Sequence, residues 1–236
     1  MVLRLDGLRA DYAGTPSATD GVQLELARLA DHVVFQSRYS RDVFAKAGFS
    51  SPAHSVIPNG VDGNVFHPGA RQPWDGRRPL RLLASSWSEN PAKGHAAVAA
   101  FAALPGVELR FVGRWPAGLE RGTVRVEPPM AHAALAGAYR WADAFLFPAR
   151  REACPNAALE AMASGLPLLY HAEGGTAEVA APYGVELSSD PAADLARLKN
   201  EYGALFERVR KDRVRFTISR AGGDYLTLFK GLCADR

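Results

Sequence analysis

Short apolar runs alternate with longer segments of helical character along most of the chain. Leu80–Ala84, Val107–Val112, Ala144–Phe147 and Leu168–Tyr170 are such runs, and an alanine-rich or amphipathic segment separates each from the next. Strands that alternate with helices are typical of a parallel sheet, because parallel strands need a long crossover connection. The pattern therefore predicts an α/β fold in which helices cover both faces of a parallel sheet.

One polar stretch interrupts this alternation. Residues 69–78 contain Pro and Gly and indicate a linker. From the linker onward, about five strands with their helices predict a Rossmann-like domain with a C-terminal helix in residues 79–236. Residues 1–68 form a partial α/β segment by the same criteria. The predicted helices cover residues 21–30, 38–47, 95–104, 133–141, 156–164, 192–210 and 223–233, and the predicted strands cover 33–37, 55–57, 80–84, 107–112, 124–126, 144–147 and 168–170.

Charge and cysteine content narrow the class of protein. The formal net charge is +3 over 236 residues and the charges are scattered, so we expect no nucleic-acid partner. The two cysteines form no C-x-x-C pair, which argues against a zinc site or a redox dithiol. Few cysteines, and a charged start where a signal peptide needs an apolar run, predict a cytoplasmic protein. Peripheral membrane contact stays open, because a few basic or apolar side chains are enough for it.

A loop and a helix follow the buried strand that ends at Phe147. In open parallel sheets ligands bind beyond the carboxyl ends of the strands, so this loop lies where a site is expected. Pro155 suits the first position of the helix, since it has no N–H to donate and its φ is fixed. The N–H groups of Asn156, Ala157 and Ala158 are then free at the positive end of the helix dipole, which predicts an anion site suited to a diphosphate.

Two glutamates lie on either side of this helix start. Glu152 is in the loop and Glu160 about one turn into the helix, so both can face one crevice. A carboxylate accepts hydrogen bonds in pairs, which suits adjacent hydroxyl groups of a sugar or a ribose. The alternative is that Glu152 only favours the helix N-terminus electrostatically and that Glu160 is solvated. Cys154, beside the helix start, is either a thiol with a lowered pKa or simply a small residue of the loop.

The full string resembles the E-x7-E motif of the retaining glycosyltransferases of family 4, whose GT-B fold has two facing Rossmann domains. In that family the pattern E-x-x-x-N-x-x-x-E-A-x-x-x-G-x-P is followed by a Gly-Gly and a Glu. The matching residues are Glu152, Asn156, Glu160, Ala161, Gly165, Pro167, Gly174, Gly175 and Glu178. The resemblance implies that Glu152 contacts the transferred sugar, that Glu160 contacts the ribose, and that the backbone at Asn156 and Ala157 holds the diphosphate.

Other segments resemble the same family. Three of them are similar to its interdomain region: Val34–Ser37, Val56–Asp62 and Phe66–Pro68. Ser86–Ser88 with Lys93 is similar to its donor-phosphate loop and implies Lys93 as a cation for the leaving diphosphate, with Arg114 a weaker phosphate contact. Lys93 and Glu152 are the residues that the resemblance assigns to catalysis. The predicted substrate-binding residues are Ser86, Lys93, Arg114, Glu152, Cys154, Pro155, Asn156, Ala157 and Glu160.

The resemblance covers about residues 28–236 and has two departures. The family usually has an Arg a few residues before the Lys of the phosphate loop, where this chain has Ser86-Trp87-Ser88-Glu89. A subgroup with the pattern S-W-S-x-x-P-x-K-G is similar to this stretch. The family's N-terminal acceptor domain usually has well over a hundred residues, whereas about 68 residues precede the linker here. We therefore expect residues 1–68 to be a remnant of that acceptor domain and residues 79–236 to bind a nucleotide sugar.

The resemblance implies transfer of a hexose from a nucleoside-diphosphate sugar to an acceptor hydroxyl, such as that of a glycan, with retention of configuration. Lys93 and the helix start at Asn156 would stabilise the charge on the leaving diphosphate. No D-x-D motif is evident, so we expect neither a metal nor another cofactor. The base, the sugar, the acceptor and the oligomeric state stay open.

Two rival hypotheses remain. The chain is a sugar-nucleotide-binding module, either non-catalytic or half of a split enzyme whose acceptor domain is a separate chain. Alternatively, it is a Rossmann-like domain of another class, such as an NAD-linked oxidoreductase or a sugar-nucleotide epimerase. The second rival is disfavoured, because no G-x-G-x-x-G follows the first strand after the linker.

Overall fold

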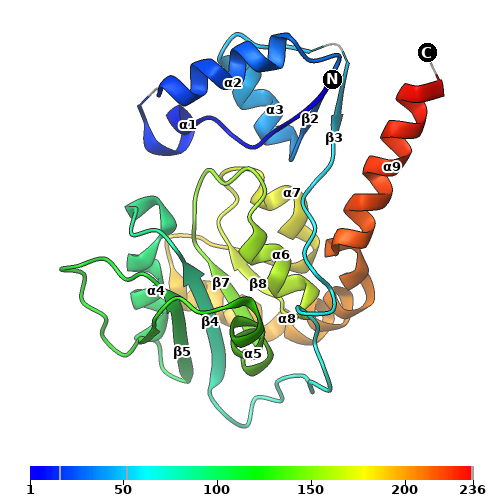
Figure 1. Ribbon diagram of the computed structural model, residues 1–236. Helices are drawn as coiled ribbons and strands as arrows, with labels where there is room; N and C mark the ends of the chain where they lie inside the picture. The colour runs from blue at the N-terminus through cyan, green and yellow to red at the C-terminus, as the bar shows by residue number, and fades with distance from the viewer. Residues whose placement is uncertain (16, 52, 235–236) are drawn as a thin grey trace.

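The computed structural model describes residues 1–15, 17–51 and 53–234. The chain forms two α/β units, which lie one above the other in Figure 1 and are joined by residues 57–79. The N-terminal unit contains β1 (Val2–Leu5), α1 (Arg9–Ala13), α2 (Ala18–Arg28), β2 (His32–Phe35), α3 (Arg38–Lys46) and β3 (His54–Val56). Its strands form a parallel sheet in the order β1-β2-β3.

The C-terminal unit is larger and contains most of the regular structure. Its strands are β4 (Leu80–Ser86), β5 (Val107–Gly113), β6 (Arg125–Glu127), β7 (Ala144–Phe147), β8 (Leu168–Tyr170) and β9 (Gly184–Glu186). Its α-helices are α4 (His95–Ala102), α5 (His132–Trp141), α6 (Asn156–Ala163), α7 (Thr176–Ala180) and α8 (Pro191–Asp212). Its 3₁₀ turns are η1 (Pro91–Lys93), η2 (Ala181–Tyr183) and η3 (Arg213–Phe216). The last helix, α9 (Ile218–Ala234), runs back toward the N-terminal unit (Figure 1).

The strands of the C-terminal unit form one parallel sheet. In the described residues it has six strands in the order β6-β5-β4-β7-β8-β9. The chain begins in the middle at β4, adds β5 and β6 on one side, and then crosses to β7, β8 and β9 on the other. This is the strand order of doubly wound nucleotide-binding sheets, and its direction reverses between β4 and β7.

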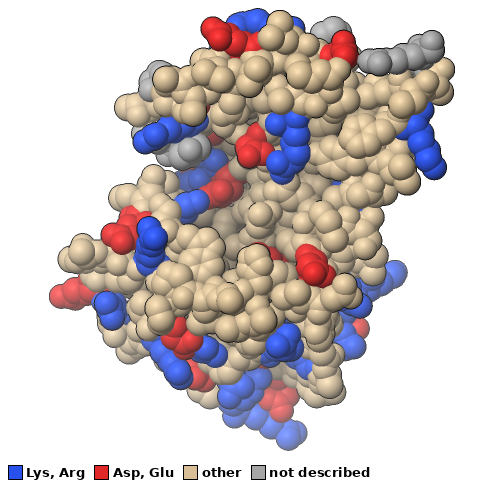
Figure 2. Space-filling model, viewed as in Figure 1, with Lys and Arg blue, Asp and Glu red and all other residues tan. Residues whose placement is uncertain are grey.

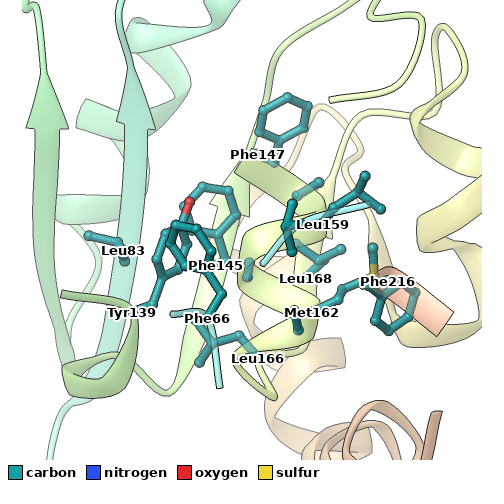
Figure 3. Packing of buried hydrophobic residues seen from close by; sticks show 14 of the residues in the cluster. Phe66, Leu83, Tyr139, Phe145, Phe147, Leu159, Met162, Leu166, Leu168 and Phe216 are labelled. Carbon is teal, nitrogen blue, oxygen red and sulfur yellow. The ribbon is translucent and has the colours of Figure 1, made fainter. Parts of the chain in front are cut away.

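Both faces of this sheet are covered by helices. Leu82 of β4 packs in a cluster with α4 and α8, and its neighbour Leu83 packs in a cluster with α5 and α6. Successive side chains of a strand point to opposite faces, so burial on both sides requires an unbroken apolar run. Figure 3 shows part of the second cluster, in which Phe145 of β7 lies beside Tyr139 of α5 and near Leu159 of α6. The predicted α/β fold, with a parallel sheet between two helical layers, is confirmed.

The N-terminal unit has its own small core. The strand β2 is buried along its whole length, and Val33 and Phe35 pack with Phe44 of α3 and with Phe49. Ser37 is the N-cap of α3, and its side chain accepts a hydrogen bond from the Ser40 N–H at 3.0 Å.

Some short elements are not among those that the sequence patterns predicted. The strand β9 and the helices α1 and α7 have three to five residues each and no predicted counterpart. The last helix begins at Ile218 rather than at Gly223, since Gly222 and Gly223 lie inside it although glycine usually disfavours a helix interior. The helices in the described part of the chain fall short of the length and apolar character that a membrane span needs.

Candidate functional site

A crevice opens where the direction of the six-stranded sheet reverses. The strands β4 and β7 are hydrogen-bonded neighbours, but the chain leaves β4 toward β5 and leaves β7 toward β8. Connections that leave in opposite directions open a crevice at the carboxyl ends of two such strands. The walls of the crevice are therefore residues 87–94 and 148–155, and these segments and their neighbours carry most of the predicted site residues.

The loop after β4 is held in a compact shape by its own polar groups. The Ser86 hydroxyl bonds to the backbone of Ser88, and the Asn90 side chain accepts from the Ala92 N–H at 2.9 Å at the start of η1. This turn ends at Gly94, where φ is 76° and an added Cβ would lie 2.7 Å from the Cβ of Pro148. Only glycine allows the β4 loop to approach the β7 loop this closely. The approach brings Lys93, the last residue of η1, to the crevice.

The loop after β7 leads into α6. Pro155 has a φ of −74° and a ψ of 118°, and the first intrahelical bond runs from the Leu159 N–H to the Pro155 carbonyl at 3.2 Å. Pro155 is thus the N-cap rather than the first helical residue as predicted, because its extended ψ places it outside the helix. The N–H groups of Asn156, Ala157 and Ala158 precede that first bond and lie at the positive end of the helix dipole.

Glu152 and Lys93 form an ion pair across the crevice. The ammonium group of Lys93 donates to the Oε1 atom of Glu152, with about a third and a quarter of the two side chains exposed (32% and 24%). The preceding residue, Arg151, has a φ of 57°, an uncommon value for a residue with a side chain. Its N–H donates to the Glu173 carbonyl and its guanidinium to the Glu173 carboxylate. Lys93 and Glu152, the two residues that the resemblance assigns to catalysis, are therefore in contact through their ion pair.

The glycine pair after β8 lets two loops touch. Glu152 forms an isolated parallel bridge with Gly174, and the Gly175 N–H donates to the Glu152 carbonyl at 2.7 Å. Gly174 has a φ of 112°. An added Cβ on Gly175 would lie 2.0 Å from the Ala153 carbonyl oxygen. The Gly-Gly of the sequence pattern thus supports the backbone at Glu152 directly.

Glu160 is partly buried and is held by Tyr139. The Tyr139 hydroxyl donates to the Oε2 atom of Glu160 at 3.0 Å, and it also faces the Ala157 carbonyl at 3.2 Å. Burial raises the pKa of the Glu160 carboxyl, while the bond from Tyr139 and the nearby His132 lower it. The alternative in which Glu160 is a solvated surface residue is wrong, because the carboxylate lies inside the protein against α5.

One cavity of about 310 Å³ gathers most of the predicted residues. Those that line it are Ser86, Lys93, Glu152, Pro155, Asn156, Ala157 and Glu160. Trp87, whose side chain is half-exposed, and His132 also line it, although neither is among the predicted substrate-binding residues. The glutamates eight residues apart and the start of α6 thus face one space, as the loop-and-helix pattern predicted.

The structure places two predicted residues differently. Arg114 is exposed and lines neither this cavity nor the larger one described below; only its backbone lies near, where its N–H donates to the Ser86 carbonyl at 2.9 Å. Cys154 lines only the larger cavity and is buried, with the Asn59 N–H 3.4 Å from its Sγ atom. Burial raises the pKa of Cys154 to about 11. The alternative of a thiol with a lowered pKa is therefore wrong, because desolvation outweighs the helix start.

A larger cavity of about 840 Å³ lies between the two units and adjoins the first, since Lys93, Glu152 and Asn156 line both. Figure 2 shows the hollow between the units, with basic and acidic side chains on its walls. The N-terminal unit and the connecting residues 57–79 contribute polar side chains to it: Arg4, Asp6, Asp11, Gln23, Gln36, Tyr39, Ser40 and Asn59. The β7 loop contributes Arg150 and Arg151 from the other side.

Asn59 is the central residue of this contact, and the sequence patterns assigned it no role. Its side-chain amide donates to Gln36 at 3.0 Å, to the Cys154 carbonyl at 3.1 Å and to the Asn156 side chain at 2.9 Å. Arg4 donates to its side-chain oxygen. The stretch Val56–Asp62 was predicted to resemble the family's interdomain region, but no contact was predicted for Asn59, whose amide joins the connection between the two units to the start of α6.

Glu178 provides a second hydrogen-bonded contact between the two units. It lies in α7 and accepts from the N–H groups of Arg38 and Tyr39, at 2.9 Å and 2.7 Å, in the first turn of α3. A carboxylate at the N-terminus of a helix satisfies donors that have no partner within the helix.

In the described segments, the His, Cys, Asp and Glu side chains form no group of three or more that could hold a metal ion.

Comparison with known proteins places this geometry in context. Residues 88–199, from the β4 loop into α8, match the family model described as Glycosyl transferases group 1. A search of curated proteins gave no match.

Several solved structures are similar. Sucrose-phosphate synthase from Thermosynechococcus elongatus has a TM-score of 0.76 at 19% identity, covering 100% of this chain and 68% of its own. HepE from Anabaena in complex with UDP and glucose has a TM-score of 0.77 at 20% identity, covering 97% of this chain and 71% of its own. A glycosyltransferase from Rickettsia africae has a TM-score of 0.70 at 15% identity, covering 94% of this chain and 69% of its own. The chain therefore has the GT-B fold of these glycosyltransferases.

Proposed function

We propose that this chain is a glycosyltransferase that moves a hexose from a nucleoside-diphosphate sugar to an acceptor hydroxyl and retains the sugar's configuration, as members of family 4 do. One observation carries the proposal. Lys93, Glu152, Glu160 and the start of α6 line a single cavity at the carboxyl ends of β4 and β7. A cation and a helix N-terminus bind the diphosphate of a nucleotide sugar. Two carboxylates accept hydrogen bonds from the hydroxyl groups of its ribose and of its transferred sugar.

Each group has one role in donor binding. The diphosphate accepts hydrogen bonds from the N–H groups of Asn156 and Ala157 and pairs with Lys93. Glu160 accepts from the ribose hydroxyls and Glu152 from the hydroxyls of the transferred sugar. HepE structures with UDP and with UDP-glucose support a sugar nucleotide as the ligand of a shared fold.

The acceptor's hydroxyl oxygen bonds to the sugar's anomeric carbon, and the proton of that hydroxyl passes to the departing diphosphate. The reaction breaks the bond between the anomeric carbon and the diphosphate. Negative charge develops on the diphosphate as this bond breaks, and it is stabilised by Lys93 and by the start of α6. When the donor binds, before this bond breaks, Lys93 exchanges the Glu152 carboxylate for the diphosphate, which leaves Glu152 to orient the sugar. The larger cavity, with its polar side chains from both units, holds the acceptor, for which we propose a glycan in the cytoplasm.

We also propose that the reaction needs no metal. Lys93 and the dipole of α6 supply the positive charge that a divalent cation supplies in other transferases. Excess EDTA should therefore leave transfer unchanged, and added Mg²⁺ or Mn²⁺ should not raise it. Loss of activity in EDTA that Mn²⁺ restores would contradict this part of the proposal.

Titration calorimetry against UDP-, GDP- and ADP-sugars tests the donor site. We expect one class to bind, and Lys93→Ala and Glu160→Ala each to weaken binding by about 10-fold or more, since each removes a charged hydrogen-bond partner. Lys199→Ala is the matched control, because Lys199 lies in α8 against Trp74 and lines neither cavity. Binding to none of the three classes overturns the proposal.

A second candidate function is a donor-binding module without transfer activity, whose acceptor site is completed by a separate chain. The observation that favours it is the small N-terminal sheet, with three strands against six in the other unit among the described residues. Release of the free sugar or of a glycosylated acceptor by the purified chain identifies an enzyme. Donor binding without either product identifies the module.

A further inference from the structure

The Tyr139 hydroxyl is a polar group inside an apolar cluster. The side chain is fully buried, and its ring lies 5.7 Å from the ring of Phe66 and 5.3 Å from that of Phe145, measured between centroids. Figure 3 shows the ring of Tyr139 among these residues. A buried hydroxyl needs a partner, and this one donates to Glu160 and faces the Ala157 carbonyl. Packing alone would be served equally well by phenylalanine.

The position of this hydroxyl determines how Glu160 meets the cavity. Its bond is to Oε2, which fixes the rotation of the carboxylate and leaves Oε1 for a ligand in the cavity that Glu160 lines. The other charged or titratable groups that line this cavity are His132 of α5, Lys93 of the β4 loop and Glu152 of the β7 loop. Lys93 pairs with Glu152 rather than with Glu160. The hydrogen bond that the Glu160 carboxylate accepts comes from Tyr139.

We propose that Tyr139 is a positioning residue that orients the Glu160 carboxylate toward the ribose hydroxyls of the donor, and that the site thereby selects ribonucleotides over deoxyribonucleotides. This inference rests on the proposed function, because it needs Glu160 to be part of the donor site. It narrows the donor to sugars carried on ribonucleoside diphosphates. Sugars carried on deoxythymidine diphosphate, which lack the 2′-hydroxyl, are excluded.

Tyr139→Phe tests the proposal, because it removes one oxygen and keeps the ring. The probes are UDP, GDP and ADP with their 2′-deoxy counterparts, measured by calorimetry on the full chain. We expect the wild-type protein to bind its ribonucleotide about 10-fold more tightly than the deoxy form. Tyr139→Phe should bind the ribonucleotide several-fold more weakly and the deoxy form unchanged, so that the preference largely disappears.

Tyr202→Phe is the matched control. Tyr202 is also buried, and its hydroxyl donates to the Asp143 carbonyl at 3.2 Å from α8, on the opposite face of the sheet. This variant should keep the ribonucleotide preference of the wild-type protein. Equal loss of preference in both variants would show that the effect is one of packing and would overturn the proposal.

The pH dependence supplies a readout that a packing role would not change. Burial raises the pKa of Glu160 and the Tyr139 bond lowers it, so the pKa should rise further in Tyr139→Phe. Ribose binding needs the carboxylate, which is present above the pKa. As the pH is lowered, whatever ribose preference remains in the variant should therefore be lost at a higher pH than in the wild-type protein.

The outcomes separate this inference from the function on which it rests. If the wild-type protein binds no nucleoside diphosphate, the proposed function fails. If it binds one but shows no ribose preference, or if Tyr139→Phe keeps the preference, only the inference fails. Should Tyr139→Phe unfold, Glu160→Gln carries the test, because it keeps the side-chain shape while removing the charge. Retained preference in Glu160→Gln overturns the inference.

Discussion

Gly175 illustrates how one residue without a side chain can decide the shape of a site. Its missing Cβ would lie 2.0 Å from the Ala153 carbonyl oxygen and 2.7 Å from the Ser37 hydroxyl. The residue therefore lies where the β7 loop, the segment after β8 and the N-terminal unit all meet. No side chain fits there without moving one of them.

Gly175→Ala should destabilise the protein by about 2 kcal/mol or more, because the methyl group collides with backbone that cannot rotate away. Urea unfolding measures the loss. Gly231→Ala is the control, since an added Cβ at Gly231 meets nothing within 4 Å and the residue lies inside α9. There alanine should stabilise by up to about 1 kcal/mol. Similar effects at the two positions would contradict the steric argument.

The two cysteines should differ in reactivity. Burial raises the pKa of Cys154 to about 11, whereas Cys233 is exposed on α9. At pH 8, well below a pKa of 11, Cys154 remains a neutral thiol that a reagent cannot reach. Iodoacetamide should therefore label Cys233 in the folded protein and both residues in urea, as peptide mass spectrometry would show. Labelling of Cys154 at the rate of Cys233 in the folded state would argue against the buried position.

Among the elements, α3 and α7 are coupled across the two units. The Glu178 carboxylate of α7 accepts from two N–H groups of the first turn of α3. Glu178→Ala should cost about 1 kcal/mol of stability and speed hydrogen exchange at residues 38–40, because those donors lose their acceptor. Mass-detected hydrogen exchange and thermal unfolding measure the two effects.

Asp190→Ala provides the comparison for that variant. Asp190 caps α8 within one unit, accepting from the N–H groups of Ala192 and Ala193 at 3.0 Å and 3.1 Å. We expect a similar loss of stability but no change in exchange at α3. If Glu178→Ala leaves the exchange of α3 unchanged, the carboxylate does not hold the two units together in solution.

The long periodic elements of the C-terminal unit were predictable from the sequence. Strand β8 has the predicted bounds, and α5 and α6 begin or end within one residue of theirs. Strand β8 is buried along its whole length, and the apolar residues of α5 and α6 pack in one buried cluster, so local pattern and tertiary packing agree. The short elements α1, α7 and β9 were not predictable, because their stability comes from sheet pairing and packing with residues far away in the sequence.

The candidate site was predictable where its residues are close in sequence. Asn156 and Glu160 are four residues apart in α6, so their common face follows from helix geometry, and Glu152 lies in the loop that leads directly into that helix. Asn59 and Tyr139 were not found, since each contacts that segment from a distant part of the chain. Arg114 does not line the cavity, because it contacts Ser86 through its backbone N–H rather than through its guanidinium.

At the scale of the whole molecule, the C-terminal helix α9 contacts the beginning of the connection between the two units, at Pro58 and Asn59. The Arg220 guanidinium donates to the carbonyls of Pro58 and Asn59 at 3.1 Å and 2.8 Å. Arg220→Ala should speed hydrogen exchange along residues 217–234 and lower stability by about 1–2 kcal/mol, since two backbone acceptors lose a charged donor. Lys230→Ala, an exposed position on the same helix, should change neither. Equal effects of the two variants would show that α9 is held by other contacts.

The chain crosses between the units twice, and the two crossings lie side by side. Val61 bridges to Thr217, and the Ile218 N–H donates to the Val61 carbonyl at 2.8 Å. Two adjacent crossings define a rotation axis, because sliding one unit past the other would break this pairing while rotation would not. Rotation about that axis moves the rim of the larger cavity farthest from Asn59 the most. We therefore expect ligands to enter at that far rim, while the start of α6, beside the axis, keeps its geometry as the units swing apart.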